Sequence, residues 1–174
     1  MSEKAEVLKS ELISNLVNVR KNIIKEASAI PPDKQDRVCL GVWSIKDLLA
    51  HLAGWDYTNL AAARDILAGN LPEFYAHIDR DWKTYNTSLV GKFKRDDFSE
   101  MLTLVSSSHQ QLVDYLKSLP AEVFSKDTGV RSRGYKVTIA RLLQAETRDE
   151  QVHLQQIHEF SEEVSHENPQ AGAR

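Results

Sequence analysis

The chain has 174 residues, of which 41% are apolar and 27% charged, and its formal net charge is −3. This length suits one domain with a sizeable core, and the composition is ordinary for a globular protein. The charge balance, without clustered Lys and Arg, argues against a nucleic-acid partner, and no apolar run approaches the roughly 20 residues that span a bilayer. We therefore expect no nucleic acid and no membrane among its partners. The single Cys39 fits a reducing, cytoplasmic compartment.

Apolar residues at steps of three and four predict a series of long helices. The first covers roughly residues 4–29 and ends at Pro31, because proline disfavours a helical residue before it and has no amide hydrogen to donate. The second begins after Ser44, whose hydroxyl can cap an early amide group, and ends at Gly69. Asp47 lies in its first turn, where the helix dipole favours a negative charge.

The segment after the second helix is long and rich in aromatic residues. Their spacing predicts a short helix over roughly residues 78–93, which we expect to cover one end of a pocket. Asp97 then caps a third long helix, which ends before Pro120 because proline cannot continue it. This segment therefore separates the second and third long helices by more than a tight turn.

The end of the sequence predicts one more long helix. The glycine-containing link over residues 121–137 favours a short β-like excursion, and Thr138 caps a helix from residue 139 to about residue 163. Four long helices with one longer connection predict an all-α four-helix bundle with a crossover connection and a short extra helix after the second helix. We expect a single helical bundle domain over residues 1–164 and a disordered, polar C-terminal tail over residues 165–174.

The last helix carries polar residues on the stripe that should face the core. Both ends of this stripe are apolar and its middle is not, as the series shows: Leu142, Glu146, Asp149, His153, Ile157 and Phe160. Buried charge is expensive unless it is paired or coordinates a metal ion. Asp149 and His153 are four residues apart, so they project from one helix face and can supply two ligands to one ion.

A third ligand is expected from the second helix, where His51 shares a face with Trp55. His51, Asp149 and His153 then predict a two-histidine, one-carboxylate site for a divalent metal ion, with coordination positions left open for water or substrate. Glu146, one turn before Asp149, is predicted to orient a ligand or to act as a general base.

Each of these residues also has a simpler structural interpretation. A histidine beside an apolar stripe is more often a hydrogen-bonded core residue, which applies to His51 and also to His109. Asp149 can instead form a surface ion pair with a neighbouring arginine, and a half-turn change in the facing of the last helix would bring Glu150 inward. Cys39 is expected to be a small buried hydrophobe rather than a nucleophile.

Two motifs resemble the DinB/YfiT-like superfamily. The sequence VWSIKDLLAHLAGWD over residues 42–56 resembles its second-helix signature, in which a tryptophan and a capping hydroxyl precede a histidine; Ser44 and His51 match these positions. His153 and the isoleucine four residues later resemble the pattern of the final helix, where another ligand stands four residues before the histidine. That ligand is Asp149 here, histidine in many DinB-like proteins, and acidic in the mycothiol-dependent maleylpyruvate isomerase branch, which implies a changed metal preference.

Over residues 4–162 the chain is most similar to the ClbS/DfsB branch of this superfamily. The matching features are the IPPDKQ turn, the AHLAGWD segment, the Trp82, Tyr85 and Asn86 element, and a helix that begins near FSEML. The resemblance implies a four-helix bundle with a crossover. ClbS-like members resemble a self-protection hydrolase that opens an electrophilic cyclopropane in a genotoxin. Such members can lack the histidine triad, so the resemblance does not carry this activity onto the three predicted ligands.

The leading prediction is a DinB-like metal-dependent enzyme, a hydrolase or thiol transferase that acts on a small electrophilic molecule in stress or toxin protection. Trp55, Trp82 and Tyr85 are predicted to line its substrate pocket. The ion would be zinc, nickel, iron or manganese, and the sequence does not identify a thiol cofactor. Two alternatives stay open: a metal-free ClbS-like hydrolase of a strained ring, and a non-catalytic stress-response binding module. Because bundles of this type often pair through helix faces, a homodimer is expected, above all for the binding module.

Overall fold

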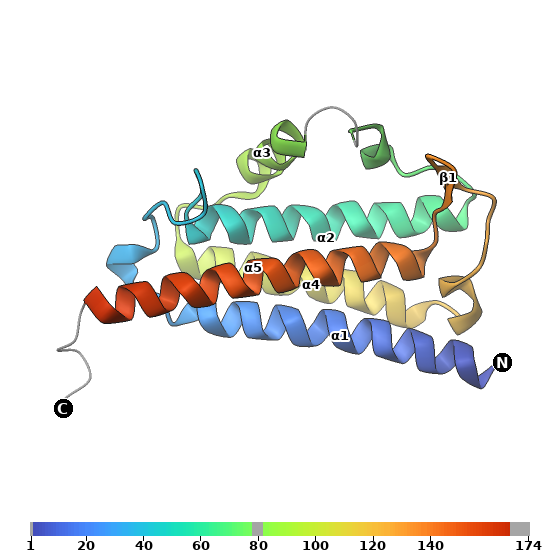
Figure 1. Ribbon diagram of the computed structural model, residues 1–174, viewed down its shortest axis with the longest axis horizontal. Coiled ribbons are helices and arrows are strands. Elements are labelled where there is room, and N and C mark those ends of the chain that lie inside the picture. Colours follow the sequence, from blue (N-terminus) through green and yellow to red (C-terminus); the bar gives the residue numbers. More distant parts are fainter. Residues whose placement is uncertain (1, 78–81, 168–174) are drawn as a thin grey trace.

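A computed structural model, which describes residues 2–77 and 82–167, consists of four long helices that lie side by side (Figure 1). These are α1 (Glu3–Ser28), α2 (Ile45–Leu67), α4 (Phe98–Ser118) and α5 (Ile139–Glu167). α1 and α5 run in one direction, and α2 and α4 run in the other. A shorter helix, α3 (Trp82–Phe93), lies outside the bundle against α2. The predicted all-α four-helix bundle with a crossover and a short extra helix is confirmed.

The helices begin where the sequence places capping residues. Ser44 Oγ accepts a bond from the Asp47 amide at 3.3 Å, and Asp47 Oδ2 accepts one from the Ser44 amide at 2.9 Å, which completes a capping box. Asp97 Oδ1 accepts a bond from the Glu100 amide at 2.8 Å at the start of α4. Thr138 Oγ1 accepts one from the Arg141 amide at 3.3 Å at the start of α5. These local bonds fix where each element starts.

The connections contain short regular elements. In the described part of the chain, three 3₁₀ turns occupy Pro32–Lys34, Glu73–His77 and Ala121–Phe124. The predicted β-like excursion is an antiparallel hairpin, β1 (Arg131–Ser132) and β2 (Tyr135–Lys136). Its two turn residues have positive φ, 50° at Arg133 and 80° at Gly134, as a tight two-residue hairpin requires.

Two predicted boundaries lie next to residues outside the described part of the chain. The helix expected over residues 78–93 is described only from Trp82, because residues 78–81 lie outside the described part of the chain. α5 continues to Glu167, so the first three residues of the predicted tail, 165–167, are helical, and residues 168–174 again lie outside the described part. No helix within residues 2–77 and 82–167 is long and apolar enough to cross a membrane.

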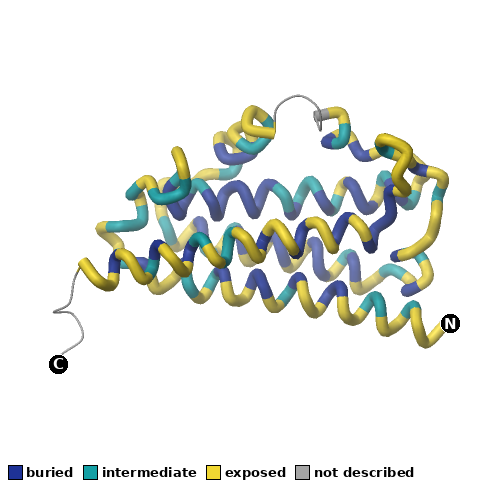
Figure 2. Tube along the Cα trace, viewed as in Figure 1, coloured by how far each residue is buried: buried dark blue, intermediate teal, exposed yellow. Residues whose placement is uncertain are grey.

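The apolar core lies between the inward faces of the four long helices, as the buried stretches in Figure 2 show. Leu16 and Ile23 of α1, Leu48 of α2, and Leu112 of α4 are fully buried. Arg20 lies among them on the same stripe of α1 and is 1% exposed. A charged side chain in such a place needs partners, which are described below.

The packing of α3 on α2 depends on Gly54. A Cβ atom at this position would lie 2.8 Å from the Leu89 Cβ and 3.1 Å from the Phe93 ring. At Gly91, also helical, a Cβ atom would meet nothing within 4 Å. A substitution at Gly91 is therefore a matched control for the same substitution at Gly54.

We expect Gly54→Ala to be less stable than Gly91→Ala by about 1–3 kcal/mol, because both gain helix propensity but only the first overpacks an interface. Urea unfolding of the two variants measures this difference. Equal stability would mean that α3 does not pack closely on α2 at this glycine.

Candidate functional site

The three predicted metal ligands converge between α2 and α5. His51 comes from the first half of α2, and Asp149 and His153 come from one face of α5. Asp149 Oδ2 lies 3.4 Å from His153 Nε2 and 3.9 Å from His51 Nε2, and a candidate ligand atom of each residue lies within 4.8 Å of the others. The ring centroids of His51 and His153 are 5.1 Å apart, and the rings meet edge to face. Three donors at these separations can approach one small cation.

His51 is buried without a hydrogen bond. It is 2% exposed, its ring packs 4.9 Å from Trp43, and neither ring nitrogen has a hydrogen-bond partner among the described residues. Burial lowers the pKa of His51, so the ring is held in its neutral form, which is the form that binds metal ions. A buried imidazole with an unpartnered Nε2 that faces a carboxylate and a second imidazole fits a metal ligand.

His153 is oriented by its neighbours. Its Nδ1 lies 2.8 Å from Gln156 Oε1, an arrangement that places a proton on Nδ1 and leaves Nε2 facing Asp149. Burial lowers the pKa of His153, but the contacts with Asp149 and Gln156 outweigh this and raise it overall. The contacts with His153 and then His51 hold the pKa of Asp149 well below its usual range, so this carboxylate is ionised.

The position of Asp149 differs from the expectation of a site in the interior. Its side chain is 57% exposed, whereas the next residue, Glu150, is fully buried. One residue corresponds to 100° of rotation about a helix axis, and the structure turns Glu150, not Asp149, toward the bundle axis. The triad therefore lies at the edge of the bundle with its carboxylate open to solvent. The donor set of two imidazoles and one carboxylate fits a divalent transition-metal ion, with room for an exogenous ligand.

A cavity of about 510 Å³ lies beside the triad. Its walls come from α2, α5, α3 and the segment before α3, and its lining residues are His51, Trp55, Asn59, Phe74, Tyr75, Trp82, Asn86, Leu142, Ala145, Glu146 and Asp149. Trp55 and Trp82 thus line the predicted pocket, with ring centroids 5.6 Å apart. Its volume is in the range of small-molecule sites, and it combines aromatic walls with several polar side chains that can orient a ligand.

Tyr85 has a different place from the one expected. It lines a separate hollow with Gly54, Leu89 and other residues, and it packs behind Trp55 at 5.5 Å between ring centroids. Its hydroxyl lies 3.3 Å from Thr58 Oγ1. The structure therefore gives Tyr85 a supporting position behind the tryptophan wall, since its side of α3 faces α2 rather than α5.

Glu146 lies on the floor of the cavity and is buried. Burial, together with the neighbouring Glu150 carboxylate, raises the pKa of Glu146 to about 8. The group is therefore mostly protonated at neutral pH and can exchange a proton near that pH. This is the property expected of a general acid or base, the role that the sequence predicted for it.

The raised pKa of Glu146 makes stability depend on pH. An unfolded chain loses this proton near pH 4.5, whereas the folded chain keeps it to about pH 8. Between these values the folded state binds more protons, so the wild type loses stability as pH rises. We expect Glu146→Gln, which cannot ionise, to gain stability relative to the wild type by a few kcal/mol between pH 5 and pH 8. Urea unfolding across this range tests it, and parallel curves for the two proteins would show that the pKa of Glu146 is ordinary.

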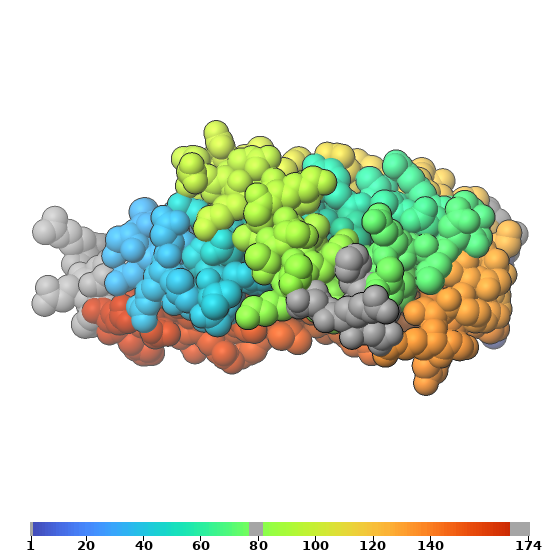
Figure 3. Space-filling view, turned by 90° about the horizontal axis from the view of Figure 1, so that it is seen from above, coloured from blue at the N-terminus to red at the C-terminus, as the bar shows by residue number. Residues whose placement is uncertain are grey.

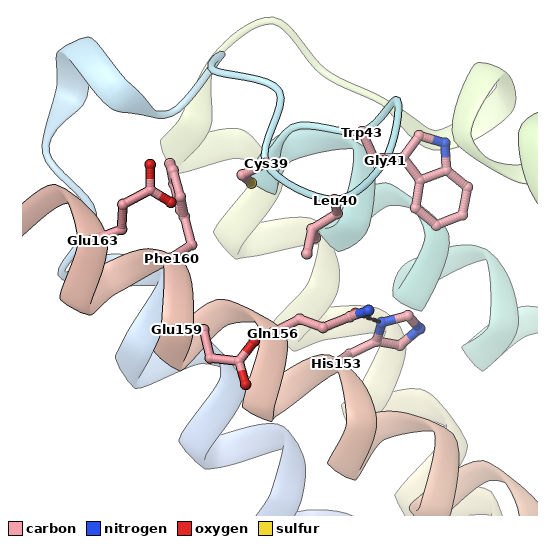
Figure 4. A pocket seen from close by; sticks show the side chains of 9 residues that line it. All are labelled: Cys39, Leu40, Gly41, Trp43, His153, Gln156, Glu159, Phe160 and Glu163. Atoms are coloured by element: carbon pink, nitrogen blue, oxygen red, sulfur yellow. Dashed lines mark hydrogen bonds between the residues drawn. The ribbon is translucent and has the colours of Figure 1, made fainter.

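His153 also lines a second hollow, between α5 and the loop before α2 (Figure 4). Cys39, Leu40 and Trp43 lie on the loop before α2, and Gln156, Glu159 and Glu163 face this hollow from α5. Cys39 is half-buried, and burial raises the pKa of its thiol to about 11. A thiol with such a pKa is a poor nucleophile, in agreement with the expectation that Cys39 serves as a packing residue.

A buried ionic network, which the helical pattern did not predict, lies next to the cavity. Arg20 of α1 pairs with Asp56 of α2 through Nη1–Oδ2 at 2.7 Å and Nη2–Oδ1 at 3.1 Å, and with Glu150 of α5 through Nη2–Oε1 at 2.6 Å. From α4, Ser108 Oγ donates to Asp56 at 2.6 Å, and His109 Nδ1 lies 3.4 Å from it. The position of Arg20 between Leu16 and Ile23 on an apolar stripe was the signal available in the sequence.

Asp56, His109 and Glu150 also form a group of possible metal ligands. The Arg20 guanidinium already lies between the two carboxylates and pairs with both. This second group therefore has its counter-charge and is explained as a structural network.

Comparison with solved structures supports the fold. The crystal structure of the colibactin self-resistance protein ClbS in complex with a dsDNA is similar, with a TM-score of 0.67 and 16% identity over 87% of this chain and 93% of that one. An uncharacterised protein from Escherichia coli UTI89 matches with a TM-score of 0.71 and 14% identity over 90% of this chain and 94% of that one. No curated protein matches the sequence.

One expectation from the charge balance is wrong. The absence of clustered Lys and Arg was taken to exclude a nucleic-acid partner, yet ClbS, a protein of the same fold, was crystallised with double-stranded DNA. Overall net charge is a poor guide here, because a few cations on one face suffice for contact with phosphates.

The predicted resemblance to a family is confirmed by a match along most of the chain. The model of the DinB superfamily matches residues 15–157. This stretch includes His51, Asp149 and His153, together with all of the residues that line the cavity. Both the sequence match and the bundle architecture lead to the same assignment: the chain belongs to the DinB superfamily.

Proposed function

We propose that this protein is a metal-dependent enzyme of the DinB superfamily, a hydrolase or thiol transferase that acts on a small electrophilic molecule. The observation that carries the proposal is the convergence of His51, Asp149 and His153 beside an aromatic cavity. Two imidazoles and a carboxylate hold zinc, nickel, iron or manganese in many proteins. The similarity in fold to a colibactin self-resistance protein supports a role in protection against a reactive compound.

The chain's own residues have separate tasks in this proposal. His51, Asp149 and His153 hold the ion, which when bound lowers the pKa of a water molecule or a thiol and polarises an acyl oxygen. Glu146, with a pKa of about 8, takes or gives a proton at the substrate. Trp55 and Trp82 form an apolar wall that orients the substrate and limits access of water. The thiol cofactor of a transferase is not identified by these residues.

Elemental analysis tests the proposal directly. Untagged protein, purified without added metal, is expected to contain about one divalent ion per chain, and chelation followed by addition of each metal in turn should identify the preferred ion. Folded protein that is free of metal, or that keeps its activity after chelation, would contradict the metal-dependent proposal and support a metal-free hydrolase. Light scattering on the same samples tests the predicted homodimer.

Binding to nucleic acid is a second candidate function. The observation in its favour, besides the ClbS complex, is the segment over residues 126–136, which carries four cationic side chains and one carboxylate. Its hairpin lies on the same face of the molecule as α3 (Figure 3). Fluorescence anisotropy with a labelled duplex should show affinity that falls with salt and that Arg133→Glu weakens. An affinity that does not respond to this change would exclude the hairpin as the contact.

A further inference from the structure

The cavity beside the candidate metal centre has one wall whose polar groups take no part in the function proposed above. This wall is formed by α3 and by the 3₁₀ turn before it, which bring Asn86 and Tyr75 to the cavity. His51 and Asp149 line the same cavity from α2 and α5. Asn86 and Tyr75 are both half-buried, so their polar groups can meet a molecule that enters from solvent.

The orientation of Asn86 is fixed by a tryptophan. Its Oδ1 accepts a hydrogen bond from Trp55 Nε1 at 3.1 Å. An indole N–H can only donate, so the atom that faces it must be the amide oxygen, and Nδ2 with its two hydrogens takes the other branch of the side chain. This Nδ2 has no hydrogen-bond partner in the described part of the chain. Asn86 is therefore held beside the cavity as a donor.

Tyr75 supplies a second donor. Its ring stacks on Phe74, with the ring centroids 4.3 Å apart, and its hydroxyl has no hydrogen-bond partner among the described residues. Burial raises the pKa of Tyr75, so the hydroxyl keeps its proton at neutral pH. Neither this hydroxyl nor Asn86 Nδ2 is among the unpartnered atoms that lack accessible surface, so a ligand can reach both groups.

The charges around the cavity restrict which acceptor these donors can take. None of the described residues that line it is a lysine or an arginine, and the Asp149 carboxylate is ionised. An anionic acceptor would therefore enter without a lysine or arginine to pair with it, which is unfavourable in a partly buried place. The carbonyl oxygen of a neutral molecule carries no net charge and can accept two hydrogen bonds.

We propose that this wall binds the carbonyl oxygen of a small, neutral, planar molecule, which accepts a hydrogen bond from Asn86 Nδ2 and takes the Tyr75 hydroxyl as its second donor. The planar part of the molecule lies against Trp55 and Trp82. The class comprises aromatic and conjugated ketones, esters and amides. The assignment of this class to a substrate rests on the proposed function, which places the reaction at the triad, but the pairing with Asn86 does not require a metal ion.

Two probes of the same shape test the subsite. In 2-isopropenylnaphthalene a methylene group replaces the carbonyl oxygen of 2-acetylnaphthalene, so the ratio of their affinities reports on the carbonyl alone. Asn86→Asp keeps an oxygen for Trp55 Nε1 but replaces the Nδ2 donor by an acceptor. In ligand-observed NMR titrations this change should lower the ratio of ketone to alkene affinity about tenfold. An unchanged ratio in Asn86→Asp would overturn the proposal.

Tyr75→Phe tests the second donor, because it removes only the hydroxyl. It should lower the same ratio by about three- to tenfold, and an unchanged ratio would remove Tyr75 from the proposal. Asn18→Asp, at an exposed position on α1, is the control for the added charge, and Tyr115→Phe, on α4 and outside the lining of this cavity, is the control for the lost hydroxyl. Both controls should keep the wild-type ratio, and an equal fall in them would contradict a specific pairing.

Repeating the titrations with a chelator separates the subsite from the metal centre. The effect of Asn86→Asp on the ratio should persist, because the two donors belong to the chain. Persistence in protein that contains no ion supports the subsite and contradicts only the metal-dependent enzyme. If the chelator abolishes the effect of Asn86→Asp, the carbonyl oxygen is bound by the ion instead, and the proposal is overturned.

Discussion

Replacement of Arg20 by methionine is expected to lower the free energy of unfolding by about 3–5 kcal/mol, because it leaves two buried carboxylates without their counter-charge. Arg20 is 1% exposed, and Asp56 and Glu150, its partners, have fully buried side chains. Urea unfolding measures the loss. Arg148→Met is the matched control, since Arg148 is exposed and bonds only to a carbonyl of its own helix in the described structure; it should change stability by less than about 0.5 kcal/mol.

The loss of stability in Arg20→Met is expected to depend on pH. Burial raises the pKa of Asp56, but the nearby Arg20 and His109 outweigh this and lower it overall. A lowered pKa contributes stability above the unfolded value of about 3.9, and this contribution is lost as pH falls through the folded pKa. The difference in free energy of unfolding between the wild type and Arg20→Met should therefore become smaller as pH falls. A loss of less than about 1 kcal/mol at neutral pH would mean that water, not Arg20, compensates the carboxylates.

Removal of either histidine of the triad is expected to weaken divalent-ion binding by more than about 100-fold. That value is the upper end of what the loss of a merely supporting residue costs, so a larger effect identifies a direct ligand. His51→Ala and His153→Ala should both show it in isothermal titration with zinc and nickel. His158→Ala is the control, because His158 is half-exposed on the same helix and faces Glu26 and Glu162 instead.

The pattern of losses would distinguish a metal centre from a cluster of hydrogen-bonding groups. Circular dichroism must first show that each variant is folded. If His51→Ala and His153→Ala bind the ions as tightly as His158→Ala does, the three residues are no metal site, and the function proposed above would lose its main support.

Helical periodicity predicted most of this architecture, because the four long helices carry regular apolar stripes and local caps. Ser44, Asp97 and Thr138 each cap the helix that follows, as bonds between residues three apart require no knowledge of the tertiary fold. The position of Asp149 and His153 on one helix face could be predicted for the same reason, because it depends only on their spacing along the helix.

The direction in which a side chain points could not be predicted where it depends on a small rotation of a helix about its axis or on a partner far away in the sequence. Asp149 and Glu150 are adjacent acids near the edge of the same stripe, and which one turns inward is decided by Arg20, 130 residues away from Glu150. Tyr85 and Trp82 are three residues apart on α3, yet only Trp82 lines the cavity. The burial of Asn59 was not predicted, because a single asparagine between a threonine and a leucine forms no pattern that indicates a core position.

The ionic network has a consequence for substitutions among the residues that line the cavity. Asp56 follows Trp55, and Glu150 follows Asp149, so α2 and α5 are each anchored one residue beyond a residue that lines the cavity. Because α1, α2, α4 and α5 all contribute to this network, the axial orientation of α2 and α5 is set independently of what the cavity holds. Substitutions among the residues that line the cavity are therefore expected to leave the relative orientation of α2 and α5 unchanged.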